Sequence, residues 1–141
     1  MDVIKFAGFI SQIENVLESM KHSFSRNNTP TDFEKFVVEA SMQVIEVNKY
    51  DCWIDYTEGG HSFPDIVFSF SDGGKYGIEV KSSTNANSPD DSWGILGNSI
   101  LGSTRIDVND LYLMFIKINK NVIEIGLYKV ICYPLEFSRL A

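Results

Sequence analysis

Cysteine and basic residues are both scarce in this chain of 141 residues. Its two cysteines, Cys52 and Cys132, lie far apart and have no Cys-x-x-Cys companion, so the sequence offers no zinc-site pattern. No apolar run approaches the ~18 residues of a membrane span, and Asp2 and Lys5 come too early for a signal peptide. We therefore expect a reduced, cytoplasmic protein without a zinc site or a membrane segment.

The shortage of basic residues bears on possible partners. The chain has 12 Lys and Arg residues against 19 Asp and Glu, a formal net charge of −7. Proteins that bind nucleic acid usually carry a basic surface, because neutralising phosphates supplies much of their affinity. A protein of this charge that handles DNA needs locally concentrated basic residues, a metal ion that offsets its carboxylates, or a basic partner domain beyond the end of this chain.

The remaining composition is typical of a globular protein, with 44% hydrophobic and 22% charged residues. At this length we expect one domain with a proper core. Apolar residues recur every three or four positions over residues 3–24 and again over 31–48, which predicts two amphipathic helices. Thr31-Asp32-Phe33-Glu34 has the pattern of a capping box, which would open the second helix.

Five later segments have the composition of β-strands: 50–57, 63–71, 75–83, 110–118 and 122–131. Glycine-rich or polar turns join the second strand to the third and the fourth to the fifth, which predicts two hairpins. The stretch 84–107 is irregular, with one short helical candidate at 93–103. Helices first and strands afterwards predict an α/β sandwich, with one central mixed β-sheet flanked by helices.

Charged residues interrupt the most apolar strand pair of the chain. Asp65 lies in the first of these strands, and Glu79 and Lys81 lie in the second. Side chains alternate between the two faces of a sheet, so Glu79 and Lys81 share a face while Ile78 and Val80 point into apolar packing.

The face on which Asp65 lies depends on the turn. If residues 72–74 form a three-residue loop, Ser71 pairs with Lys75, and Asp65 lies opposite Lys81 on the same face. A two-residue loop would place Asp65 on the other face. A three-residue loop needs a positive φ near its end, which Gly74 can supply, and this favours the register that gathers the three charges.

Two carboxylates and an ammonium on a mostly apolar strand pair are costly unless they are paired or bind a cation. One interpretation is an ion pair of Lys81 on a solvated face. The other is a site for Mg²⁺, which takes one or two carboxylates together with water and phosphate oxygens. A lysine beside such a site can orient or help deprotonate an attacking water.

Pro64-Asp65, followed after 13 residues by Glu79-Val80-Lys81, resembles the motif of the PD-(D/E)xK nuclease superfamily, which has the restriction-endonuclease-like fold. The resemblance covers residues 31–131 and is closest to type II restriction endonucleases. It implies that Asp65 and Glu79 bind Mg²⁺, with Mn²⁺ as a substitute, that Val80 lends its backbone carbonyl, and that Lys81 is the catalytic lysine. It also implies that residues 1–141 form a single nuclease domain or the catalytic part of a longer protein.

Glu34 has two interpretations. The family often places a metal-binding or metal-adjacent glutamate on the helix before the strands, and by this resemblance Glu34 joins the catalytic and metal-binding residues, with Glu39 as the alternative. The other interpretation is the capping box, in which Glu34 only accepts a hydrogen bond from the backbone of Thr31.

Small polar residues follow the lysine and suit contacts with DNA phosphates. The candidates are Ser82, Ser83, Thr84, Asn98, Ser103, Thr104 and Arg105. Arg105 is the most specific of them, because a guanidinium matches a phosphate or a guanine edge. The other interpretation of this stretch is an ordinary polar loop.

The resemblance thus implies a Mg²⁺-dependent endonuclease that cuts double-stranded DNA, most similar to a type II restriction enzyme and, as such enzymes usually are, a homodimer. A structure-selective nuclease such as a junction resolvase would share the metal site but normally has a more basic surface. A third interpretation is an inactive nuclease-like fold that serves in DNA binding or assembly. The intact set of Asp65, Glu79 and Lys81 argues against it.

Overall fold

The computed structural model of the protein describes residues 3–60, 64–84, 108–119 and 122–130. The helices in these ranges are α1 (Val3–Ser19), a short 3₁₀ helix (Lys21–Ser23) and α2 (Pro30–Asn48). The strands are β1 (Cys52–Asp55), β2 (Ile66–Phe70), β3 (Lys75–Ser83), β4 (Asp110–Asn119) and β5 (Val122–Val130). Among the described residues, no helix is long and apolar enough to cross a membrane.

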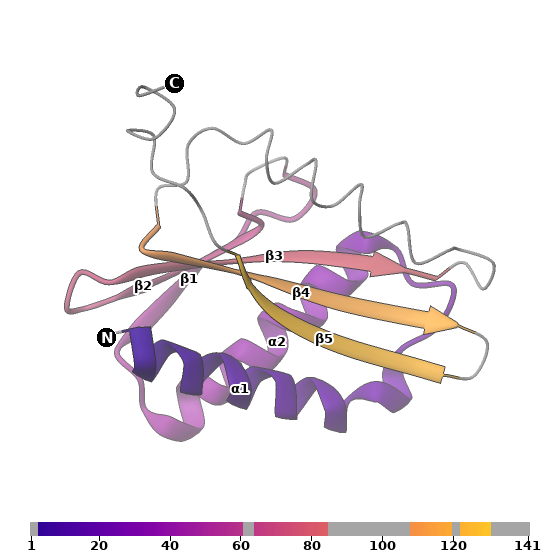
Figure 1. The fold of residues 1–141 in the computed structure, drawn as a ribbon, viewed down its shortest axis with the longest axis horizontal. Helices are drawn as coiled ribbons and strands as arrows, with labels where there is room; N and C mark the ends of the chain where they lie inside the picture. Colours follow the sequence, from indigo (N-terminus) through magenta and orange to yellow (C-terminus); the bar gives the residue numbers. More distant parts are fainter. Residues whose placement is uncertain (1–2, 61–63, 85–107, 120–121, 131–141) are drawn as a thin grey trace.

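The strands form one sheet in the order β1-β2-β3-β4-β5 (Figure 1). Only the β3–β4 pair is parallel; the other three pairs are antiparallel. The expected mixed sheet and α/β class are therefore confirmed. The two expected hairpins are also confirmed, β2 with β3 and β4 with β5, the latter closed by the pair Asn119 and Val122. The helical candidate at 93–103 lies outside the described residues.

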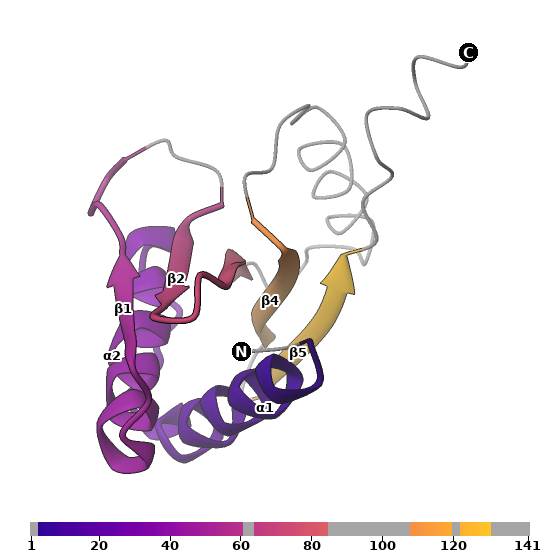
Figure 2. The same ribbon diagram turned by 90° about the vertical axis from the view of Figure 1, so that its left-hand side faces the viewer.

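Both α-helices lie on the same side of the sheet, α2 against β3 and α1 against β5 (Figures 1 and 2). The main core fills the space between them and is rich in aromatic rings. Phe6 of α1 stacks on Tyr76 of β3 with ring centroids 4.1 Å apart, and Phe9 meets Phe68 of β2 edge-on at 5.2 Å. Ile78 and Val80 of β3 belong to this core. Because side chains alternate along a strand, Glu79 and Lys81 project from the opposite face.

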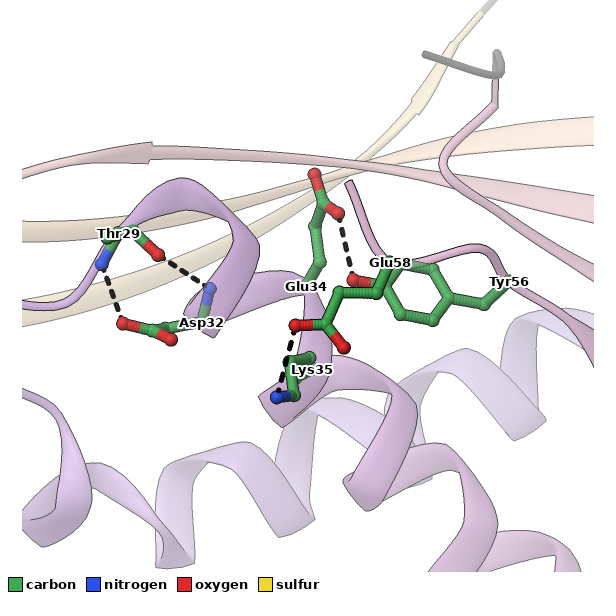
Figure 3. A network of polar contacts seen from close by, with 6 residues as sticks. All are labelled: Thr29, Asp32, Glu34, Lys35, Tyr56 and Glu58. Atoms are coloured by element: carbon green, nitrogen blue, oxygen red, sulfur yellow. Dashed lines mark hydrogen bonds and ion pairs between the residues drawn. The ribbon is translucent and has the colours of Figure 1, made fainter. Parts of the chain in front are cut away.

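The start of α2 differs from the predicted capping box. Thr29, not Thr31, is the N-cap, and Pro30 occupies the first turn. The Thr29 hydroxyl accepts from the Asp32 N–H at 3.1 Å, and the Asp32 carboxylate accepts from the Thr29 N–H at 2.8 Å (Figure 3). The box therefore begins two residues earlier than predicted, and Glu34 does not cap the helix.

The turn between β2 and β3 also differs from the prediction. Lys75 pairs with Ser69 instead of Ser71, so the register is shifted by two residues. The loop still has three residues, 71–73, because the residues on either side of it are joined: the Phe70 N–H donates to the Gly74 carbonyl at 2.9 Å. The positive φ belongs to Gly73 (93°), not to Gly74. A shift of two residues preserves the face of every side chain, so Asp65 stays on the face of Glu79 and Lys81 but lies beside Glu79.

Candidate functional site

Two hydrogen bonds join Asp65 to Glu79 and to the next residue, Val80. The Asp65 N–H donates to Glu79 Oε1 at 3.1 Å, and the Val80 N–H donates to Asp65 Oδ2 at 2.9 Å. Each bond uses one oxygen of its carboxylate. The other oxygen of Glu79, Oε2, lies 3.6 Å from the Lys81 ammonium. The three charged residues of the predicted motif are thus gathered at one place on the sheet.

The end of β2 creates this arrangement. The β2–β3 pairing stops at Ile66 and Ile78, while β3 continues to Ser83. From Glu79 onward, β3 has no β2 partner among the described residues, and Asp65, directly before β2, turns its carboxylate onto the Val80 N–H. In a strand the N–H and the carbonyl of one residue point to the same side. The Val80 carbonyl therefore points toward Asp65 as well, and its role as a metal ligand stays a prediction.

Burial sets the electrostatics of the pair. The Glu79 side chain is only 7% exposed, whereas that of Lys81 is 28% exposed. The β4 neighbour of Glu79 on the same face is the buried Leu113. Burial, and then the hydrogen bond and negative charge of Asp65, raise the pKa of Glu79 to about 8, although the Lys81 ammonium opposes the shift. Without a bound cation, the site therefore holds a proton near neutral pH.

Glu34 is not a cap but belongs to a second polar contact at the start of α2. Its Oε1 accepts a hydrogen bond from the Tyr56 hydroxyl at 3.1 Å (Figure 3). Burial and the negative charge of Asp65 raise the pKa of Glu34, while the Tyr56 hydroxyl and Lys81 oppose the rise.

The described residues do not gather Glu34 with Asp65 and Glu79 as a set of direct ligands. Among them, no group of three or more His, Cys, Asp or Glu side chains is placed to hold a metal ion. The available donor set is the Asp65–Glu79 pair with the Val80 carbonyl. Two carboxylates together with water are what Mg²⁺ commonly takes from a protein, so the chemistry of these donors suits that ion.

Several predicted features of the site are not described by the structure. Asn98, Ser103, Thr104 and Arg105 lie outside the described residues. Ser82, Ser83 and Thr84 are described and half-buried at the end of β3, beyond Lys81, and their contact with DNA stays a prediction. A cavity of about 490 Å³ lies between α2 and β1, lined by Met42, Ile45, Ile54 and Tyr56 among others.

Tyr56 is the residue that sequence reasoning missed. It follows β1 directly and contacts Glu34 across 22 positions of the chain. No local pattern marks it, because a tyrosine at the end of an alternating strand is most simply a packing residue.

Comparisons of the chain with protein-family models, with curated proteins and with solved structures found no match.

Proposed function

We propose that this protein is a Mg²⁺-dependent endonuclease that hydrolyses phosphodiester bonds of double-stranded DNA in the manner of a type II restriction enzyme. The observation that carries the proposal is the pair of hydrogen bonds that joins Asp65 to Glu79 and Val80, with Lys81 beside Glu79. The PD-(D/E)xK resemblance assigns these three residues to one site from the sequence alone, and the geometry supports that assignment.

Asp65, Glu79 and the Val80 carbonyl would hold the cation. All three are hard oxygen donors, which suit Mg²⁺ and also Mn²⁺. The two hydrogen bonds from backbone N–H groups each fix one oxygen of a carboxylate, Oε1 of Glu79 and Oδ2 of Asp65. When bound, the ion would supply a Lewis acid that offsets phosphate charge and acidifies a bound water.

Lys81 has a different task from the two acids. Its ammonium lies on the carboxylate face, partly exposed, at the solvent side of the Glu79 contact. A lysine in this position can orient a water and stabilise negative charge that develops on the phosphate. The task of Lys81 is therefore to orient the attacking water and to stabilise the transition state.

The net charge shapes the encounter with DNA. A chain of −7 repels phosphates, so a divalent cation at the acidic site should be needed for tight binding. A cytoplasmic homodimer acting on palindromic DNA is the corresponding proposal for assembly, since two-fold symmetry in the protein matches two-fold symmetry in the site.

The test is cleavage of supercoiled plasmid DNA with Mg²⁺ and with EDTA. Wild type should cut only with Mg²⁺, and Asp65→Ala and Glu79→Ala should lose at least ~10²-fold in rate while remaining folded. Glu18→Ala is the matched control, because Glu18 is a partly exposed acid on α1 that pairs with Lys21 and changes the net charge equally. A folded wild type without Mg²⁺-dependent cleavage would refute the proposal. So would full activity in Asp65→Ala.

The same variants separate the nuclease from a binding module. In Ca²⁺, which fills carboxylate sites but usually supports hydrolysis poorly, a gel shift should show DNA binding by wild type and weak binding by Asp65→Ala. Tight binding that ignores both the metal and the substitution, together with no cleavage in Mg²⁺, would favour the inactive DNA-binding interpretation.

A further inference from the structure

β1 is an edge strand whose outer side has no strand partner among the described residues. It pairs only with β2, and Figure 2 shows it at the margin of the sheet with α2 beside it. The Asp51 carbonyl accepts from the Ser71 N–H, just after β2, at 3.1 Å, so the backbone of Asp51 faces β2. Backbone groups of successive residues point to alternate sides of a strand. The N–H and carbonyl groups of Cys52 and Ile54 therefore point outward, away from β2.

The side chains of the same two residues border an apolar cavity. Cys52 and Ile54 line it from β1, and Val38, Met42 and Ile45 line it from α2. Its volume of about 490 Å³ and mainly apolar lining are typical of binding sites. Met42 is 59% exposed although it is apolar. A strand added to the outer edge of β1 would bring every second side chain to this cavity.

The other face of β1 is exposed and acidic. Trp53 is 59% exposed, and Asp51 and Asp55, which flank it on the same face, are also exposed. Glu46 adds a carboxylate to the lining of the cavity. Within the described ranges, these three acids make no ion pair. A lysine or arginine on an added strand would meet a carboxylate here, and its cation could also lie against the Trp53 ring.

We infer that the outer edge of β1 binds an extended segment of another protein in which apolar and basic residues alternate. The segment joins the sheet as an added strand and forms hydrogen bonds with the backbone of Cys52 and Ile54. Its apolar side chains enter the cavity, and its basic side chains meet Asp51, Trp53 and Asp55. In this mode of recognition the main chain supplies affinity and the alternate side chains supply specificity. The inference does not depend on the proposed nuclease function.

Charge separates this partner from two others. A second copy that pairs antiparallel through β1, centred on Trp53, would place Asp51 opposite Asp55, and like charges directly opposite each other destabilise a strand pair. Each copy also carries a net charge of −7, which adds to the repulsion. DNA would bring its phosphates to the same acids. A basic segment is the occupant whose charge complements this edge.

The test titrates the full chain, in EDTA, with a synthetic peptide of alternating valine and lysine about eight residues long, a common strand length. Amide hydrogen exchange, followed by NMR, should slow at Cys52 and Ile54 as the peptide binds. The amides of β5, the other edge strand, should exchange as before. A peptide of the same composition with its valines and lysines in two blocks is the matched control, and it should bind at least ~10-fold more weakly because it cannot fill the cavity and meet the acids together.

A charge reversal tests the acidic face. The double variant Asp51→Lys/Asp55→Lys should bind the valine–lysine peptide at least ~10-fold more weakly and should gain binding of a peptide of alternating valine and glutamate. Because the gain needs a folded chain, it separates altered recognition from lost folding.

A second pair of variants tests the cavity. Met42→Ser should weaken binding of the valine–lysine peptide about fivefold, because it removes apolar contact. Val47→Ser is the matched control and should bind like wild type, since Val47 is an 80% exposed residue of α2 outside the cavity lining.

Unchanged exchange at Cys52 and Ile54 in the presence of the valine–lysine peptide would overturn the inference. So would a double variant that keeps the wild-type preference between the two peptides, or an equal loss in Met42→Ser and Val47→Ser. Protection of Cys52 and Ile54 that grows with protein concentration, without any peptide, would identify a second copy as the occupant and would also overturn it.

Discussion

Replacement of Glu79 by glutamine should make the metal-free protein more stable at neutral pH. The pKa of this carboxyl rises from its ordinary value of 4.5 to about 8 in the folded protein, because the side chain is buried beside Asp65. The folded state therefore holds a proton that the unfolded chain releases above pH 4.5, and stability falls as the pH rises from about 4.5 to about 8. Below this pH window the protonated Glu79 contributes its full stabilisation of the folded state, and above the window that stabilisation is lost completely.

The size of the effect follows from the shift. At pH 7 the unfolded chain has lost the proton while the folded site mostly keeps it, which costs roughly 3 kcal/mol at about 1.4 kcal/mol per pH unit. Glutamine mimics the protonated acid in shape and hydrogen bonding at every pH. Glu79→Gln should therefore melt about 5–10 °C above wild type at pH 7 in EDTA and close to wild type at pH 4.5.

The assay is a series of thermal melts between pH 4.5 and pH 9 in EDTA, with Glu18→Gln on the outside of α1 as the control for a lost surface charge. A constant difference between Glu79→Gln and wild type across this range would refute the electrostatic argument. Added Mg²⁺ should raise the melting temperature of wild type and leave that of Glu79→Gln unchanged, because a ligand that binds only the folded state stabilises it.

Three further outcomes follow from the same contacts. Lys81→Met should abolish cleavage yet keep Ca²⁺ affinity in calorimetry, because the ammonium is not a ligand; lost Ca²⁺ binding would contradict its assigned task. Gly77→Ala should impair both stability and Ca²⁺ binding, since a Cβ there would lie 2.5 Å from Pro64 Cγ and would displace the adjoining Asp65. Wild-type Ca²⁺ affinity in this variant would show that the close packing of Gly77 against Pro64 does not matter for the site. Thr29→Ala should cost about 1 kcal/mol in denaturant unfolding and leave Ca²⁺ binding unchanged, because it removes only the helix cap.

The sequence predicted the strands and the shared face of the acids because both depend on a period of two. The register was wrong by two residues, an even number, so the error moved the partner of Asp65 from Lys81 to Glu79 without turning any side chain over. The exact loop could not be read from Asp72-Gly73-Gly74, since either glycine can adopt the positive φ that only Gly73 has.

The start of α2 was misplaced because two overlapping segments each offer a cap. Thr29-Pro30-Thr31-Asp32 and Thr31-Asp32-Phe33-Glu34 both place a threonine three residues before an acid. Pro30 was the signal that could have decided between them, because proline is favoured in the first turn of a helix and Thr29 directly precedes it. The contact of Glu34 with Tyr56 had no such signal, since it depends on where α2 crosses the sheet.

The buried position of Glu79 is consistent with the proposed cation. Its neighbours on the same face of β3 and β4 include Leu111 and Leu113, which are 1% and 7% exposed, so an apolar residue at position 79 would extend a buried apolar surface. Buried ion pairs can often be replaced by apolar residues with no loss of stability, and here a second carboxylate makes the site less favourable still. A purely structural role would be better filled by leucine or glutamine. The proposed divalent cation would reverse this balance, because it would convert the repulsion between Asp65 and Glu79 into shared coordination and make their burial favourable.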